Sequence, residues 1–327
     1  MRPERTPMTD SAEQLAWFRE TFAALSDNVE GVILGKRHVI ELAFTAMISE
    51  GHLLLEDVPG TGKTTLARAL GQSVGGTSTR IQFTPDLLPG DVTGVAVFDQ
   101  RQGRFEFHAG PVFANVVLAD EINRASPKTQ AALLEVMEEG QVTVDGVSRP
   151  VGDPFLVVAT QNPVEQAGTY RLPEAQLDRF LMKTTLGYPD HAAMMRILSG
   201  AATRRRDVSA IVSADAVLAL TRIAQGVHVD PLIQDYIVRL VEATRRATQV
   251  RLGVSVRGVL ALARAARTWA ASRGRDYVTP DDVKELAEPV LAHRLILDPE
   301  AEFDGVTAQA VIGQVLLQTA PPRSRDE

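Results

Sequence analysis

The amino-acid sequence predicts an α/β domain, in which a parallel sheet is flanked by helices, followed by a smaller all-helical domain. In the first part of the chain, helical stretches alternate with short apolar runs, namely HLLLEDV (52–58), NVVLADE (115–121) and PFLVVAT (154–160). Continuous runs of Val, Leu and Ile between helices are typical of a parallel sheet that is covered on both faces. After Pro189 such runs stop.

The second part of the chain carries the start signals of helices instead. Asp230-Pro231 and Thr279-Pro280 each place an N-cap residue before a proline at the first helical position. The stretch VRGVLALARAARTWAAS (256–272) has apolar residues at helical spacing. The expected parts are a flexible N-terminus at 1–12, the α/β domain at 13–189, the all-helical domain at 190–318 and a flexible tail at 319–327.

The composition is that of an ordinary globular protein with a sizeable core. The chain has 327 residues, of which 45% are hydrophobic and 23% charged, so disorder of the whole chain is excluded. It has no cysteine, which excludes disulfides, thiolate metal sites and cysteine nucleophiles. No apolar run approaches the roughly 18 residues of a membrane helix, and the N-terminus does not resemble a signal peptide. We therefore expect no membrane insertion and a cytoplasmic location.

The net charge of minus 7 is unevenly distributed along the chain. Residues 1–189 hold 16 Lys and Arg against 24 Asp and Glu, whereas residues 190–327 hold 18 against 17. Within the second part, the stretch from Arg239 to Arg275 has nine arginines and a single acid, Glu242. These arginines either contact nucleic acid, a nucleotide or an acidic protein, or they form the solvated faces of Ala-rich helices.

A glycine-rich turn, VPGTGKTT (58–65), lies between the first apolar run and the helical stretch LARAL. Such a turn points backbone N–H groups inward, and the helix N-terminus adds its dipole, so that a polyphosphate is held. Lys63 is expected to neutralise the β and γ phosphates, and the hydroxyl of Thr64 to ligate Mg²⁺. Asp57 stands where the general pattern has glycine, so its side chain must point away from the phosphates. The residues expected to bind the nucleotide are Pro59, Gly60, Thr61, Gly62, Lys63, Thr64 and Thr65.

Polar residues follow the other two apolar runs. Asp120 and Glu121 end one of them, and Thr160-Gln161-Asn162 ends the other. Because the carboxyl ends of parallel strands meet at one edge of the sheet, Asp120 can hold Mg²⁺ through its water shell. Glu121 can activate the attacking water there. The amide of Asn162 could reach the γ-phosphate or that water, and the set predicts hydrolysis of a nucleotide.

Two hairpins are predicted inside the α/β domain. VAVFDQRQGRFEFH (95–108) has two β-prone arms around a polar turn, and GQVTVDGVSRPV (140–151) has Asp145-Gly146 flanked by alternating residues.

The order of glycine-rich loop, hydrophobic-Asp-Glu and strand-ending Asn resembles that of the AAA+ ATPases. LADEINRASPKTQAALLEVMEEGQVT (118–143) and ATQNPVEQAGTYRLPEAQLDRF (159–180) make the chain similar to the MoxR branch, and the resemblance extends from about Val32 to Leu317. It implies a P-loop AAA+ domain followed by a helical lid. VILGKRHVIELAF (32–44) resembles the segment that lines the adenine pocket, which implies ATP as the cofactor, with Mg²⁺.

The resemblance also implies roles for single residues. Asn162 corresponds to sensor 1, which orients water and contacts the γ-phosphate. Arg179 corresponds to the arginine finger that reaches into the neighbouring subunit, and Arg257 to sensor 2, which acts within its own chain. Arg171 is a weaker candidate for a second contact to the neighbour. For each of these arginines the alternative is a surface salt bridge.

The implied function is that of a homo-oligomeric ring, a hexamer, that uses ATP to remodel a client protein. The resemblance suggests a separate client with a von Willebrand factor A domain, and the two hairpins would line the central opening. Phe105 and Phe107 would either grip the client there or pack against their own hairpin. The alternatives are a nucleic-acid motor, a magnesium-chelatase-like subunit and a small-molecule kinase. The acidic total charge makes a nucleic-acid partner the weaker expectation.

Overall fold

The computed structural model of the chain describes residues 11–58, 60–162, 169–200 and 208–322. The chain divides into two compact units: an α/β unit formed by Ser26–Ala214, and a helical unit formed by the residues from Asp215 onward together with those up to Leu25. The sequence analysis begins the helical domain earlier, at residue 190. The later division has a local cause, because the backbone N–H of Ile211 donates to the carbonyl of Ser73 and so holds this segment to the α/β unit. The segments 1–12 and 319–327 lie largely outside the described residues.

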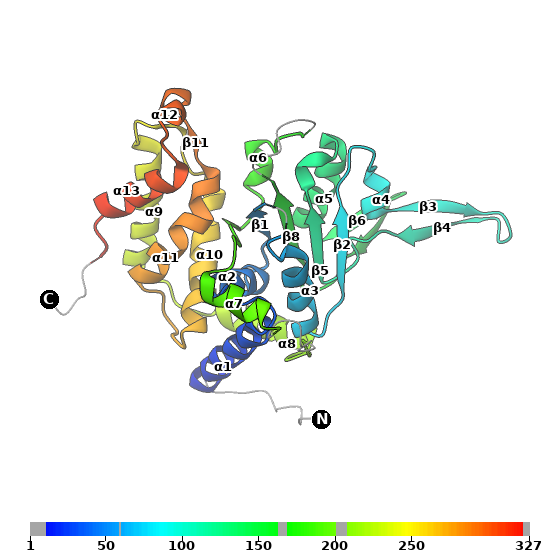
Figure 1. Cartoon of the computed structure of the whole chain (residues 1–327), viewed down its shortest axis with the longest axis horizontal. Helices are drawn as coiled ribbons and strands as arrows, with labels where there is room; N and C mark the ends of the chain where they lie inside the picture. The colour runs from blue at the N-terminus through cyan, green and yellow to red at the C-terminus, as the bar shows by residue number, and fades with distance from the viewer. Residues whose placement is uncertain (1–10, 59, 163–168, 201–207, 323–327) are drawn as a thin grey trace. The chain divides into compact units, whose positions relative to one another are not determined.

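A five-stranded sheet forms the centre of the α/β unit (Figure 1). Its order is β2-β5-β8-β1-β9, and all neighbouring strands are parallel, as the apolar runs predict. The strands are β1 (Leu53–Glu56), β2 (Ser78–Gln82), β5 (Val116–Asp120), β8 (Leu156–Gln161) and β9 (Met182–Thr184). Because the strands are parallel, the polar residues that follow β1, β5 and β8 share one edge of the sheet.

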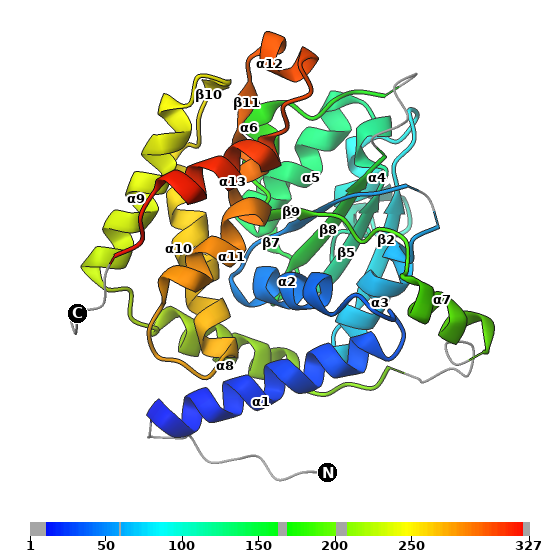
Figure 2. The ribbon, with the colours of Figure 1, turned by 60° about the vertical axis from the view of Figure 1, so that its left-hand side comes forward.

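Helices pack against the sheet on its two faces (Figure 2). Alternate strand residues such as Leu54, Val117 and Val157 join Leu133 and Leu134 of α5 in one apolar core. The helices of this unit are α2 (Arg37–Ile48), α3 (Lys63–Ser73), α4 (Pro89–Thr93), α5 (Pro127–Glu139), α6 (Glu174–Leu177) and α7 (His191–Leu198), with a 3₁₀ turn at Ile122–Arg124. The strands are buried from both sides, which explains their continuous apolar sequences.

Both predicted hairpins are confirmed. The first consists of β3 (Gly94–Asp99) and β4 (Arg104–Ala109), which project away from the sheet (Figure 1). The second consists of β6 (Gln141–Val144) and β7 (Val147–Pro150). Its turn has φ of 52° at Asp145 and 74° at Gly146, the left-handed conformations that a tight hairpin turn requires at both central residues.

The second unit is mostly helical, and the predicted N-caps begin two of its helices. The Asp230 carboxylate accepts from the N–H of Leu232 at α9, and the Thr279 hydroxyl accepts from the N–H of Asp282 at α11. Trp269 and Tyr236 are fully buried in the core. The helices are α1 (Ser11–Glu30), α8 (Ala214–Gln225), α9 (Pro231–Arg246), α10 (Val256–Ser272), α11 (Pro280–Leu291), α12 (Pro299–Phe303) and α13 (Ala308–Gln318), with a 3₁₀ turn at Ala292–Arg294.

The helical unit departs from an all-helical composition at one place. Two short strands, β10 (Val250–Leu252) and β11 (Ile296–Leu297), pair in antiparallel fashion. Both strands are too short to stand out as apolar runs in the sequence. Their pairing also joins segments that lie far apart in the sequence, so no local pattern predicts it. Among the described helices of both units, none is long and apolar enough to cross a membrane.

Candidate active site

The glycine-rich turn connects β1 to α3, and two of its glycines have left-handed backbones. The φ angles are 86° at Gly60 and 99° at Gly62, a region that residues with a Cβ rarely adopt. A Cβ on Gly60 would meet nothing within 4 Å, so the backbone conformation rather than lack of space requires glycine there. Helix α3 begins at Lys63, so its first N–H groups face this turn.

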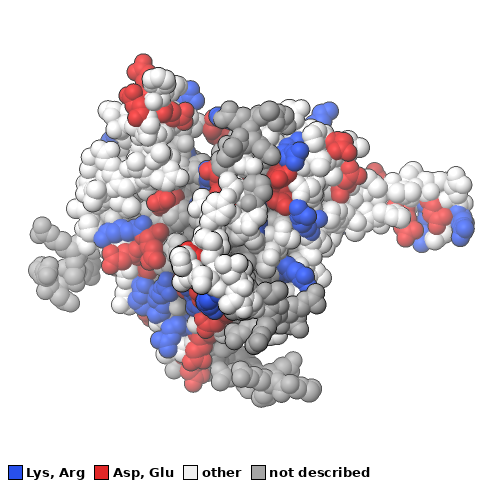
Figure 3. All heavy atoms as spheres, viewed as in Figure 1, with Lys and Arg blue, Asp and Glu red and all other residues white. Residues whose placement is uncertain are grey.

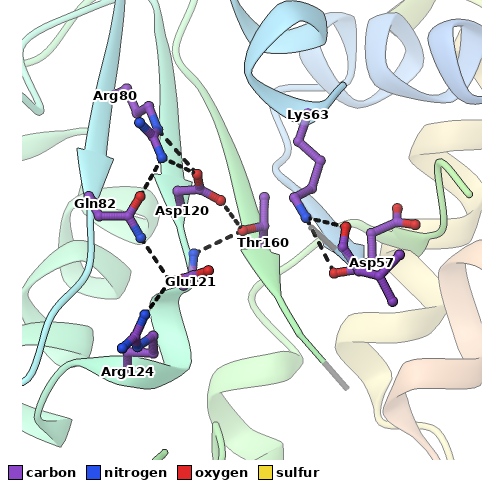
Figure 4. Close-up of polar contacts among 9 residues, drawn as sticks. Asp57, Lys63, Arg80, Gln82, Asp120, Glu121, Arg124 and Thr160 are labelled. Atoms are coloured by element: carbon purple, nitrogen blue, oxygen red, sulfur yellow. Dashed lines mark hydrogen bonds and ion pairs between the residues drawn. The ribbon is translucent and has the colours of Figure 1, made fainter. Parts of the chain in front are cut away.

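The side chain of Lys63 lies along the same turn (Figure 4). Its ammonium donates to the carbonyl of Val58 at 2.9 Å and to that of Asp57 at 3.3 Å. The side chains of Thr64 and Thr65 are exposed at the first turn of α3. Pro59 lies outside the described residues. The turn therefore presents N–H groups, hydroxyls and one ammonium, which is a set that suits an anion.

Asp57 points away from the turn, as the sequence analysis predicts. Its carboxylate is buried and accepts hydrogen bonds from the backbone N–H of Gly187, at 2.8 Å, and of Leu186. These two residues follow β9, so Asp57 fastens the end of β1 to the loop beyond the edge strand. The acidic residue has a structural role here.

Asp120 ends β5 and is surrounded by donors. Oδ1 accepts from the Thr160 hydroxyl at 2.6 Å, and Oδ2 accepts from Nη2 of Arg80 at 2.7 Å and from its Nε at 3.1 Å (Figure 4). Thr160 belongs to β8 and Arg80 to β2, the two strands that flank β5. The carboxylate of Asp120 is thus held from both sides of its strand.

Glu121, the next residue, is held by three contacts. Its backbone is left-handed, with φ of 57°, a strained conformation for a residue that is not glycine. The N–H of Glu121 donates to the Thr160 hydroxyl at 2.9 Å, which fixes the backbone. Its Oε2 accepts from Nε2 of Gln82 and from Nη1 of Arg124, each at 2.9 Å (Figure 4). Strained residues that persist are over-determined by their surroundings, and they are concentrated at functional sites.

These contacts form one closed network. Arg80 also donates to Oε1 of Gln82, so Arg80, Gln82, Glu121, Thr160 and Asp120 are linked in a ring of hydrogen bonds. The sequence analysis predicted the two acids but not Arg80, Gln82 or Arg124. Register explains the omission, because Gln82 comes to lie opposite Asp120 only through the pairing of β2 with β5.

The remaining predicted residues occupy different places. Asn162 directly follows β8, at the same sheet edge as the acids. Arg179 lies beyond α6, where its Nη2 pairs with Oε2 of Glu138 on α5 at 3.0 Å. Arg171 is exposed on the segment before α6. Arg257 is exposed in the first turn of α10, in the helical unit. The structure therefore brings together the glycine-rich turn, Asp120, Glu121 and Asn162 at the carboxyl edge of one sheet.

Comparison with known proteins agrees with this arrangement. The family profile described as ATPase family associated with various cellular activities (AAA) matches residues 52–182, and that of the AAA lid domain matches residues 242–315. Residues 52–182 include β1, the glycine-rich turn, both acids and Asn162.

Relatives extend over nearly the whole chain. The uncharacterized protein YeaC of Bacillus subtilis is 48% identical, over 91% of this chain and 94% of its own. Chaperone MoxR1 of Mycobacterium tuberculosis is 43% identical, over 95% of this chain and 85% of its own. A crystal structure from Cytophaga hutchinsonii, of a protein proposed to be an ATPase, is 39% identical and superposes with a TM-score of 0.88 over 95% of this chain and 98% of its own. With this fold, this glycine-rich turn and these relatives, the chain belongs to the MoxR family of AAA+ ATPases.

Proposed function

We propose that the chain hydrolyses ATP to ADP and phosphate at the carboxyl edge of the sheet, in a Mg²⁺-dependent reaction. The observation that carries the proposal is the ring of hydrogen bonds around Asp120 and Glu121, at the same edge as the glycine-rich turn. A turn alone would support binding of a nucleotide. The two adjacent carboxylates, each held in a defined position, support hydrolysis.

In this proposal the turn binds the phosphates. The N–H groups at the start of α3 donate to the phosphate oxygens. The Lys63 ammonium exchanges its bonds to the carbonyls of Val58 and Asp57 for the β and γ phosphates. Ile33 lies near the turn, since its Cδ1 would be 3.6 Å from a Cβ on Gly62, and it fits an apolar pocket for adenine.

The oxygen donors of the site fit a magnesium ion. Mg²⁺ prefers hard oxygen ligands and usually keeps several of its waters. The exposed hydroxyl of Thr64 would supply a direct ligand to the ion, whereas the Asp120 carboxylate already accepts from Thr160 and Arg80 and would accept from waters around it. The ion would neutralise charge on the phosphates.

Glu121 acts as the general base and Asn162 positions the water. Glu121 Oε2 takes the proton from the attacking water, for which it must leave at least one of its two donors, Gln82 and Arg124. The amide of Asn162, at the end of the neighbouring β8, orients that water and contacts the γ-phosphate.

Nucleotide binding by the turn can be tested on one side chain. Lys63→Ala should abolish detectable binding of a fluorescent ATP analogue, because the phosphate charge is no longer neutralised. The control is Lys128→Ala, an exposed lysine on α5, which should bind as the wild type does. Binding by the Lys63→Ala variant at wild-type affinity would contradict the role of the turn.

We propose that Arg179 and Arg257 also contribute to ATP hydrolysis. The role of Arg179 requires a neighbouring subunit and therefore an oligomeric ring. We assign Arg179 to the active site of a neighbouring subunit in a homo-oligomer, most simply a hexamer, and Arg257 to its own site. The support is the family resemblance of the LDRF and SVRG segments. In the single chain Arg179 pairs with Glu138, a partner that it would exchange on assembly. Arg171 is the second candidate for contact with the neighbour.

Mixing of inactive subunits tests whether Arg179 acts on a neighbour. Arg179→Ala and Lys63→Ala chains should each be inactive, yet a co-assembled mixture should regain hydrolysis, because some interfaces join an intact arginine to an intact turn. An arginine finger typically contributes about 10³- to 10⁵-fold. Failure of a proven co-assembly to regain activity would count against a role in the neighbouring site.

The substrate of the ring is proposed to be a protein, in the cytoplasm. The support is the relative named Chaperone MoxR1 and the aromatic surface of the first hairpin. Phe98 and Phe105 stack edge to face, with ring centroids 5.3 Å apart, and both are at least half exposed. Phe107 instead packs against Phe113 and under the guanidinium of Arg149. Phe98 and Phe105 thus remain accessible to a client, for which a protein with a von Willebrand factor A domain is our candidate.

A nucleic-acid motor would respond differently to salt. Motors that grip a phosphate backbone release counterions, so their activity depends steeply on salt concentration. We expect the rate of ATP hydrolysis to change less than about twofold on addition of single-stranded DNA, duplex DNA or RNA. Strong stimulation that is lost between about 50 and 200 mM salt would favour the nucleic-acid motor.

A further inference from the structure

Helix α7 is almost entirely exposed, although its sequence, HAAMMRIL, is apolar. Among its eight residues only Ala193 is buried. The large apolar side chains are exposed to 48% at Met194, 56% at Met195, 41% at Ile197 and 82% at Leu198. Figure 3 shows a mainly uncharged surface over this helix.

A helix of eight residues needs a buried face to be stable, but the α/β unit buries only Ala193 of α7. Isolated helices shorter than about 12 residues are marginal in water, and most helical stability in proteins comes from a buried face. Within the part of the chain that the structure describes, the contacts of α7 include the N-cap of Asp190 to Ala193 N–H, at 2.7 Å, and the approach of Ala193 to Gly35. Its exposed apolar face therefore suits an interface with another chain.

Helix α12 is acidic, in contrast to the apolar α7, and presents one exposed aromatic side chain. Phe303, its last residue, is 91% exposed. It stands within an acidic segment, and acidic side chains are concentrated over α12 in Figure 3. The acids of the segment are Asp298, Glu300, Glu302 and Asp304. The result is an aromatic knob surrounded by negative charge.

Two basic side chains near α7 complement this knob, whereas the carboxylate of Asp190, directly before the helix, is engaged as its N-cap. Arg196 is exposed in the last turn of α7, and the Lys36 ammonium lies 2.7 Å from the carbonyl of Tyr188, just before the helix. Methionine-rich surfaces adapt well to an inserted aromatic ring. We propose that Phe303 of one copy of the chain inserts into the methionine face of α7 on a second copy, with Arg196 facing the acids of α12.

This pairing joins two different surfaces, so each copy can use both at once. Such a head-to-tail contact generates a ring if the rotation closes. A symmetric contact of α7 with α7 would leave Arg196 without an acidic partner on the other copy's α7, which has no acid among its eight residues, and the apolar face does not suit a nucleic acid. This proposal rests on the homo-oligomer of the proposed function and adds which surfaces of the chain form its contacts. It can be tested without measuring ATP hydrolysis.

The test is disulfide cross-linking, because the chain has no cysteine of its own. Ser199→Cys is a nearly isosteric change at the exposed end of α7, and Asp304→Cys follows Phe303 directly. The two single-cysteine chains, of which one carries a size tag, are mixed and mildly oxidised. We expect a mixed dimer to predominate. The control is Leu317→Cys, a residue of α13 that is 90% exposed, which should give no mixed dimer with Ser199→Cys.

A second measurement depends on the knob itself. Phe303→Ser should prevent the cross-link and weaken self-association about 30-fold, as expected when a central anchor of an interface is lost. The melting temperature measured at a concentration where the chain is monomeric should not change, since the side chain is exposed. Cross-links only between identical cysteines, or no mixed dimer in a proven oligomer, would each overturn the proposal. Chains that cross-link as expected but do not hydrolyse ATP would instead refute the proposed function alone.

Discussion

Asp120 in the α/β unit and Asp282 in the helical unit have the same kinds of partner. The hydroxyl of Thr160 donates to Asp120 at 2.6 Å, and that of Thr279 donates to Asp282 at 2.8 Å. The Thr160 hydroxyl also accepts from the backbone N–H of Glu121, the residue after its acid, and the Thr279 hydroxyl from the backbone N–H of Asp282 itself. Each carboxylate receives two hydrogen bonds from one arginine, Arg80 or Arg275.

The two groups differ in what lies next to them. Asp282 caps the start of α11, and its hydrogen bond raises the pKa of Arg275 above the ordinary value, so the pair is a stable element of the fold. Asp120 is followed by Glu121 in a strained backbone conformation, at the sheet edge that also carries the glycine-rich turn. The same chemistry thus stabilises a helix in one unit and, in our account, positions a base in the other.

Replacement of each aspartate by asparagine should give the largest contrast between an effect on the rate of ATP hydrolysis and an effect on the free energy of unfolding. Asp120→Asn is expected to lower the rate of ATP hydrolysis about 100-fold, or roughly 3 kcal/mol of barrier. It should lower the free energy of unfolding by less than Asp282→Asn does, because Arg80 is half exposed and can be solvated when it loses its charged partner. Asp282→Asn is expected to lower the free energy of unfolding by roughly 2 kcal/mol, because Arg275 loses its charged partner. Steady-state kinetics and urea denaturation measure the two effects, and the reverse pattern would break the comparison.

Replacement of each threonine should give a smaller contrast. Thr160→Val leaves the buried carboxylate of Asp120 and the N–H of Glu121 without this partner, so we expect a rate about tenfold lower and an unfolding free energy lower by about 1–3 kcal/mol. Thr279→Val removes an N-cap, which costs about 1 kcal/mol, and should leave the rate per folded molecule unchanged. Equal rates in both variants would show that Thr160 does not position the acids.

The smallest effect is expected from Gln82. Gln82→Ala removes one donor from Oε2 of Glu121, so this carboxylate has one hydrogen bond fewer to give up before it contacts the attacking water. We therefore expect a two- to threefold higher rate, on the order of 0.5 kcal/mol. Lys284→Ala is the matched change in the helical unit, since it removes only an exposed ion pair with Asp281. It should change neither the rate nor, beyond about 0.5 kcal/mol, the stability. A lower rate in Gln82→Ala would indicate that Gln82 orients Glu121 for the reaction.

The sequence predicts those parts of the fold whose signals are local. Strands β1, β5 and β8 are buried on both faces and appear as apolar runs, and Asp145-Gly146 marks its own hairpin. Strand β2, with the sequence STRIQ, is a partly exposed edge strand without such a run. The pair of β10 and β11 depends on a contact between distant segments. Local sequence patterns therefore do not predict these elements, because they form through pairing with distant segments.

The same limit applies to the site. The glycine-rich turn and the acids after β5 lie in short motifs, so they could be identified directly. Arg80 and Gln82 become neighbours of the acids only because β2 lies beside β5 in the sheet. The pairing of Arg179 with Glu138 likewise joins separate segments.

In our proposal, the carboxylate held by Gln82 and Arg124 is the base of ATP hydrolysis. Glu121→Gln tests it most directly, with ATP affinity and turnover measured on the same preparation. The amide keeps the size of the side chain, so we predict an affinity within about threefold of the wild type, whereas loss of a general base should lower the rate about 10²- to 10⁴-fold. A Glu121→Gln variant that hydrolyses ATP at the wild-type rate would contradict the account.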